Sequence, residues 1–123
     1  RIILRGPVMD VEGSRKASRG RWGALLEAGI EISEYQPTMY HCKVLVVDGL
    51  WISVGSTNFD NRSFALNDEA NLNILDAAFA ARQIAIFEED LARSQPITLG
   101  EWKQRPLPEK FLEHTASLLR LQL

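Results

Sequence analysis

A histidine and a lysine that could act together on a phosphate group lie two positions apart, at His41 and Lys43. Side chains alternate between the two faces of a β-strand, so residues two positions apart point the same way. A neutral imidazole is a good nucleophile, and an ammonium group attracts the negatively charged oxygens of a phosphodiester. The spacing therefore predicts a pocket in which a nucleophile and a cation face the same substrate.

Three further polar residues could complete this chemistry: Ser56, Asn58 and Glu69. Lys43 and Asn58 would donate hydrogen bonds to the non-bridging phosphoryl oxygens, and Ser56 would add its hydroxyl or its backbone N–H. The carboxylate of Glu69 is the candidate partner for the second imidazole nitrogen, where it would set the tautomer and stabilise the imidazolium. These groups require no metal ion and no cofactor.

Other reactive side chains near this stretch are assigned structural roles. Asp48 lies seven positions after His41, an odd offset that sends its carboxylate to the opposite face of an unbroken strand. We therefore predict that Asp48 accepts hydrogen bonds near a turn and that Gly55 lets the chain leave the sheet. Cys42 is predicted to be a small buried apolar residue. His114, the other histidine, is expected on the surface of the last helix.

Strand and helix patterns account for most of the chain. Strand patterns cover residues 2–4, 30–35, 40–47, 51–54 and 69–75, and helix patterns cover 14–29, 77–91 and 108–121. The order β-α-β-β-β-β-α-α predicts an α/β fold with a mixed β-sheet flanked by helices. The unbroken apolar run from Val44 to Val47 predicts cover on both faces. The connection between the last two helices is expected to be irregular, because it holds Pro96, Gly100, Pro106 and Pro108.

Length and composition limit the class of protein. The 123 residues suit one domain, and one cysteine excludes an internal disulfide. The formal net charge of -2 and a sequence pI near 5.7 argue against nucleic acid as the partner. No apolar run approaches the roughly 18–20 residues of a spanning helix, and no signal-peptide pattern opens the chain. This domain is therefore expected to be soluble or peripheral.

The spacing H-x-K-x4-D from His41 to Asp48, with G-S-x-N from Gly55 to Asn58 and then Glu69, resembles the signature of the phospholipase D superfamily. Seven specified residues agree, and at about one residue in 20 per position chance agreement is of order 10⁻⁹ per start point. The flanking sequences E-Y-Q-P (34–37) and F-D-N-R-S-F-A-L-N-D-E (59–69) are similar to the second, C-terminal motif of bacterial cardiolipin synthases.

This resemblance implies an enzyme of the phosphatidyltransferase or phosphodiesterase type that works through a phosphohistidine intermediate. His41 would be the nucleophile or, in the other half-site role, the acid and base. The family builds one active site from two motifs, so residues 1–123 would be a single phospholipase D-like domain cut from a longer chain. Its second motif would come from an N-terminal half or a dimer partner, and without it the domain would be inactive.

The resemblance also implies a phosphatidylglycerol-like phospholipid as substrate and a place on the bacterial inner membrane through parts outside this chain. Two alternatives stay open. One is a homodimeric nuclease or phosphodiesterase with a single motif in each chain. The other is a non-catalytic half that only binds phosphate. Whether water or an alcohol accepts the transferred group is also open.

Overall fold

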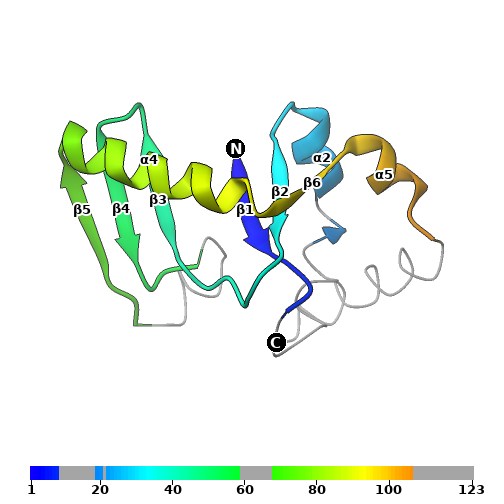
Figure 1. The fold of residues 1–123 in the computed structure, drawn as a ribbon, viewed down its shortest axis with the longest axis horizontal. Helices are drawn as coiled ribbons and strands as arrows, with labels where there is room; N and C mark the ends of the chain where they lie inside the picture. Colours follow the sequence, from blue (N-terminus) through cyan, green and yellow to red (C-terminus); the bar gives the residue numbers. More distant parts are fainter. Residues whose placement is uncertain (9–18, 21, 59–67, 107–123) are drawn as a thin grey trace. The chain divides into compact units, whose positions relative to one another are not determined.

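The computed structural model describes residues 1–8, 19–20, 22–58 and 68–106. The chain divides into two compact units, one made of Arg1–Tyr40 with Arg93–Leu123 and the other of His41–Ala92. Each unit has a three-stranded β-sheet and at least one helix. The predicted α/β class is confirmed, with one mixed and one antiparallel sheet (Figure 1).

The first unit is built on the central strand β2 (Ile32–Tyr35). Strand β1 (Ile2–Arg5) runs parallel to β2 on one side, and β6 (Ser94–Ile97) runs antiparallel to it on the other. A parallel pair needs a crossover connection, and α2 (Trp22–Glu27) lies in the segment that supplies it. Strand β2 thus has a neighbour on both edges, and all of its residues are buried.

Helix α2 ends as the sequence predicts, at a glycine. Gly29 has a φ of 82°, a left-handed conformation that costs glycine little. The N–H of Gly29 donates to the carbonyl of Leu26 at 3.1 Å, and the N–H of Ile30 donates to the carbonyl of Leu25 at 3.0 Å. These two bonds form a Schellman motif, which satisfies carbonyls that the helix end leaves open. The predicted start of this helix lies outside the described residues.

Strand β6 and helix α5 (Leu99–Gln104) occupy a segment that the sequence analysis expected to be irregular, so that expectation was wrong. Pro96 fits β6 because this strand is at an edge of the sheet, where a missing N–H removes no ladder bond on the open side. Helix α5 starts with a capping box, in which Glu101 N donates to Thr98 Oγ1 at 3.2 Å and Thr98 N donates to Glu101 Oε2 at 3.0 Å. These hydrogen bonds from Thr98 hold the pKa of Glu101 below its usual value.

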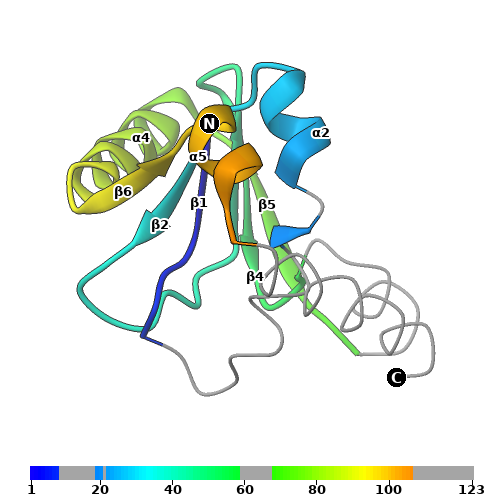
Figure 2. The same cartoon turned by 90° about the vertical axis from the view of Figure 1, so that its right-hand side faces the viewer.

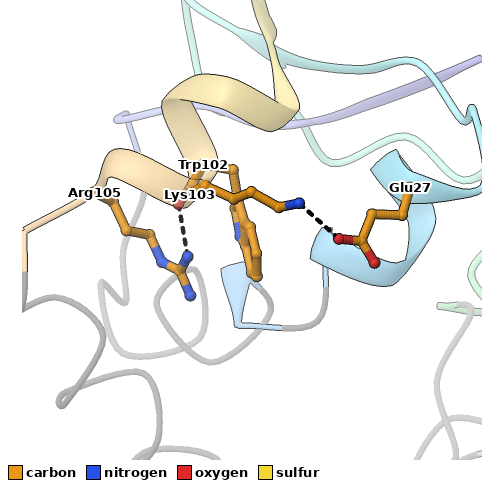
Figure 3. Close-up of polar contacts among 4 residues, drawn as sticks. All are labelled: Glu27, Trp102, Lys103 and Arg105. Carbon is orange, nitrogen blue, oxygen red and sulfur yellow. Dashed lines mark hydrogen bonds and ion pairs between the residues drawn. The ribbon is translucent and has the colours of Figure 1, made fainter.

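Helices α2 and α5 lie side by side (Figures 1 and 2). The indole of Trp102 on α5 lies against Gly23 of α2. The indole N–H donates to the carbonyl of Arg19 at 2.8 Å, and the Arg105 guanidinium lies 3.8 Å from the ring centroid. Arg105 also donates to the carbonyl of Trp102, and Lys103 pairs with Glu27 at 2.9 Å. Both contacts are drawn in Figure 3. Both side chains of that ion pair are more than half exposed, so it contributes little to stability.

The second unit is an antiparallel meander covered by one long helix. Strands β3 (Val44–Val47), β4 (Trp51–Gly55) and β5 (Asn71–Leu75) pair in sequence order, and α4 (Ala77–Leu91) lies across one face of them (Figure 1). Ile52 and Ala80 are fully buried in this unit. The bounds predicted for α4 are confirmed, and its N-cap, Asp76, accepts the N–H of Phe79 at 2.7 Å.

The expectation that strand β3 is covered on both faces is wrong. Val44, Leu45 and Val47 are 43, 47 and 40% exposed. β3 is an edge strand of a three-stranded sheet, and α4 covers only one face of that sheet. An apolar run therefore did not establish burial here, because cover depends on segments that lie elsewhere in the sequence. The predicted helix over 108–121, which holds His114, lies outside the described residues.

The packing of α2 against α5 makes a stability prediction. A Cβ on Gly23 would lie 2.3 Å from the Trp102 ring, whereas a Cβ on Gly100 would meet nothing closer than 3.9 Å. Gly23→Ala should therefore destabilise the fold by about 1–3 kcal/mol through overpacking. Gly100→Ala, the matched control inside α5, should stabilise it by about 0.5–1 kcal/mol. Urea unfolding followed by tryptophan fluorescence measures both. If both changes shifted the free energy of unfolding equally, the close packing of Trp102 against Gly23 would be ruled out.

Candidate functional site

The residues of the H-x-K-x4-D and G-S-x-N motif flank the strands of the second unit. His41 and Lys43 precede β3, Gly55 ends β4, and Ser56 to Asn58 follow it, while Glu69 comes just before β5. In an antiparallel meander the start of one strand, the end of the next and the start of the third lie at the same end of the sheet. These segments therefore meet at one end of the β3-β4-β5 sheet (Figure 1).

The segment that holds His41 and Lys43 is irregular, because β3 begins at Val44. The predicted strand from residue 40 is therefore too long at its start, and strand alternation does not govern these two side chains. The Lys43 ammonium donates to the backbone carbonyl of His41 at 2.8 Å. His41 is exposed and Lys43 is half-buried. Cys42 is also exposed, so its predicted burial was wrong, for the same reason.

The turn after β4 is tied to the start of β5. The N–H of Ser56 donates to the carbonyl of Ala70 at 3.0 Å, and the N–H of Ala70 donates to Ser56 Oγ at 3.1 Å. The backbone N–H that Ser56 was expected to offer a phosphate therefore already has an acceptor. Its hydroxyl hydrogen is the donor that Ser56 retains. On the other side, the N–H of Gly55 donates to the carbonyl of Lys43 at 3.2 Å.

Asn71 joins this arrangement, although it is not among the site residues predicted from the sequence. Its Oδ1 accepts the N–H of Thr57 at 3.3 Å, and its Nδ2 donates to Ser53 Oγ at 3.2 Å. Asn71 lies opposite Gly55 in the ladder. The available sequence signal was its position two residues after Glu69 on an alternating polar strand, but its partners lie in another strand and could not be inferred.

Asp48 lies at the opposite end of the sheet, in the turn between β3 and β4. Asp48 and Gly49 have φ of 53° and 61°, and the N–H of Leu50 donates to the carbonyl of Val47 at 3.1 Å. Aspartate is one of the few residues other than glycine that enter this left-handed region readily. The turn therefore accounts for an aspartate at this position without any contact to a substrate.

The described part of the chain carries no group of three histidine, cysteine, aspartate or glutamate side chains able to hold a metal ion. Within the same residues, no helix is long and apolar enough to cross a membrane.

Comparison with known proteins identifies relatives of this chain. Residues 1–91 match the family described as "Cardiolipin synthase, PLD-like domain". The chain is 40% identical over 103 residues to a cardiolipin synthase of Geobacillus sp. strain WCH70, an alignment that covers 84% of this chain and 20% of the relative. It is 41% identical over 97 residues to the major cardiolipin synthase of Bacillus subtilis strain 168, covering 79% of this chain and 20% of the relative.

The minor cardiolipin synthase of the same Bacillus subtilis strain is 35% identical over 96 residues, covering 78% of this chain and 24% of the relative. The chain thus spans about a fifth to a quarter of the length of these relatives. No solved structure matches the chain.

The turn at Asp48 makes a prediction that separates conformation from charge. Asp48→Asn should change the free energy of unfolding by less than about 0.5 kcal/mol, because asparagine also tolerates a positive φ. Asp48→Val should cost about 1–2 kcal/mol, because a β-branched residue does not. Urea unfolding provides the comparison. Loss of activity in a stable Asp48→Asn protein would instead show that the carboxylate takes part in chemistry.

Proposed function

The chain belongs to the cardiolipin synthase, PLD-like domain family, and from this premise we propose that it supplies one half of an active site for phosphatidyl transfer. The supporting observation is the meeting of the motif segments at one end of the β3-β4-β5 sheet. These segments hold the proposed catalytic residues His41, Lys43 and Glu69 and the proposed phosphate-binding residues Ser56 and Asn58.

The proposed reaction proceeds in two displacements at phosphorus. An imidazole nitrogen attacks the phosphorus of a phospholipid, the bond to the leaving glycerol oxygen breaks, and a second histidine protonates that oxygen. An acceptor then gives its proton to the second histidine, attacks the phosphohistidine and releases the imidazole. His41 takes one of these two histidine roles, and the Glu69 carboxylate stabilises its cationic form.

Positive charge and hydrogen bonds stabilise the phosphoryl oxygens in this scheme. The Lys43 ammonium, which donates to the His41 carbonyl, supplies the positive charge that attracts a phosphate oxygen. The Asn58 amide and the Ser56 hydroxyl add neutral donors. Because these side chains supply what a metal ion would otherwise provide, the reaction needs neither a metal nor another cofactor.

The second histidine must come from another motif. The described residues hold the single motif of His41, and the named relatives are about four to five times longer than the matched segment. We propose that residues 1–123 form one phospholipase D-like domain, the C-terminal half of a two-motif enzyme, and that the complementary motif lies in an N-terminal half. On this proposal the isolated domain is inactive.

The relatives are named cardiolipin synthases, which suggests phosphatidylglycerol as donor and an alcohol of a second phosphatidylglycerol as acceptor. Transfer from one phosphodiester to another alcohol leaves the number of phosphodiester bonds unchanged, so bond energies oppose it little. Attachment to the bacterial inner membrane would come from parts of the protein outside this chain.

Replacement of His41 in the full-length protein tests the proposal. His41→Asn should lower phosphatidyl transfer on phosphatidylglycerol vesicles by roughly 10³-fold or more, because it removes a reacting group. His114→Asn, the control at the other histidine, should retain transfer, and EDTA should have no effect on the unchanged protein. Full activity of His41→Asn would refute the assignment.

Two controls address the alternative functions. An isolated chain that forms an active homodimer and cleaves DNA in EDTA would favour the single-motif nuclease or phosphodiesterase. Tungstate, a phosphate analogue, tests the non-catalytic alternative. A full-length protein that binds tungstate but turns over neither lipid nor DNA would favour a phosphate-binding half. Acid quenching during turnover, followed by mapping of the phosphohistidine, would show whether His41 is the nucleophile.

A further inference from the structure

The Asn71 side chain connects the start of β5 to strand β4 and to the residues that directly follow β4. It starts β5, and its amide lies across the end of β4, with Nδ2 3.2 Å from Ser53 Oγ and Oδ1 3.3 Å from the Thr57 nitrogen. The Thr57 N–H can only donate, so the oxygen of the Asn71 amide must face it, and the amide nitrogen then meets the Ser53 hydroxyl. The Ser53 residue is 9% exposed, so this bond satisfies a polar group that is largely removed from water.

Gly55 is what allows Asn71 to lie there. A Cβ on Gly55 would come within 2.1 Å of Asn71 Oδ1 and within 2.2 Å of the Ala70 carbonyl oxygen. No side chain fits between the end of β4 and the start of β5 at this separation. The glycine of the G-S-x-N sequence thus has a specific steric role, which is to leave room for the Asn71 amide.

A second pair of hydrogen bonds acts beside the first. Ser56 and Ala70 exchange N–H···O bonds at 3.0 and 3.1 Å, and Ala70 directly follows Glu69. Two adjacent residues, Ala70 just before β5 and Asn71 at its start, therefore hold the turn that carries Ser56 and Asn58. The Ser56 pair uses backbone atoms on the β5 side, so only the Asn71 contacts depend on the identity of a β5 side chain.

We infer that Asn71 is a positioning residue of the site, which holds the turn of Ser56 to Asn58 in register with the segment of Glu69. The inference rests on the proposed function for the reaction it serves, but its hydrogen bonds can be measured without any activity. A misplacement of about 1 Å in a phosphate-binding group can cost up to 10²-fold in rate. The two Asn71 hydrogen bonds therefore act as a clamp on the turn, and this clamp affects turnover without touching the substrate.

The experiment compares variants of the full-length protein by amide hydrogen exchange in peptides covering residues 53–58 and by kcat for lipid transfer. Asn71→Leu keeps the approximate volume but loses both hydrogen bonds, so exchange should rise and kcat should fall, each by about tenfold or more. Asn71→Asp should keep exchange within about threefold of the unchanged protein, because a carboxylate accepts from both the Thr57 N–H and the Ser53 hydroxyl.

Asn73→Leu is the matched control. Asn73 is exposed, lies two residues further along β5, and pairs with Ser53 in the ladder. This change should leave both exchange and kcat within about twofold, since it touches neither the turn nor Gly55. Ser53→Ala removes the other end of one Asn71 bond and should accelerate exchange by a smaller factor. It keeps the inference testable if Asn71→Leu does not fold.

These outcomes distinguish the positioning role of Asn71 from the proposed function in phosphatidyl transfer. Unchanged exchange in Asn71→Leu, or in Ser53→Ala if the leucine variant does not fold, would overturn the clamp. Faster exchange with unchanged kcat would overturn the role of Asn71 in the reaction. If the unchanged protein transfers no phosphatidyl group, the proposed function fails, while the exchange data still decide whether Asn71 holds the turn.

Discussion

The antiparallel register of β3, β4 and β5 is the constraint on which the candidate site depends. Pairing of Val44 with Val54 and of Gly55 with Asn71 brings three separate segments to one end of the sheet. A slip of one residue would move every side chain of the slipped strand to the other face and would separate Asn71 from Gly55. The turn at Asp48 sets the register of the first pair, and the Ser56–Ala70 bonds close the second.

The hydrogen-bond donors at this end of the sheet are of two kinds. Backbone N–H groups bond within the protein, and side chains are the proposed donors to a phosphate. The backbone N–H groups of Gly55, Ser56 and Thr57 all donate within the protein. The proposed donors to phosphate are therefore side chains, notably the Lys43 ammonium and the Asn58 amide. These backbone bonds tie the turn after β4 to the neighbouring segments of Lys43, Ala70 and Asn71.

In the first unit, the ring of Tyr35 contacts the two residues at which the chain leaves this unit and returns to it, Tyr40 and Arg93. Tyr35 on β2 lies 4.8 Å from the Tyr40 ring and 5.5 Å from the Arg93 guanidinium, measured to its centroid. Tyr40 directly precedes His41, and Arg93 directly follows Ala92, the two ends of the second unit. Tyr40 and Arg93, the last and the first residue of the first unit on either side of the second, are thus both held against the buried central strand β2.

Local signals in the sequence determined the motif and its family resemblance, the bounds of α4, the glycine stop of α2 and the turn at Asp48, because each depends on neighbouring residues. The capping box of Thr98 and Glu101 was also a local signal. It did not lead to a predicted helix, because Pro96 and Gly100 indicated an irregular segment. Only the tertiary structure decided that β3 is an exposed edge, that the chain at His41 and Lys43 is irregular, and that Asn71 lies against Gly55. The physical reason is that cover, strand ends and cross-strand contacts are set by pairing between segments far apart in the chain, which no local pattern contains.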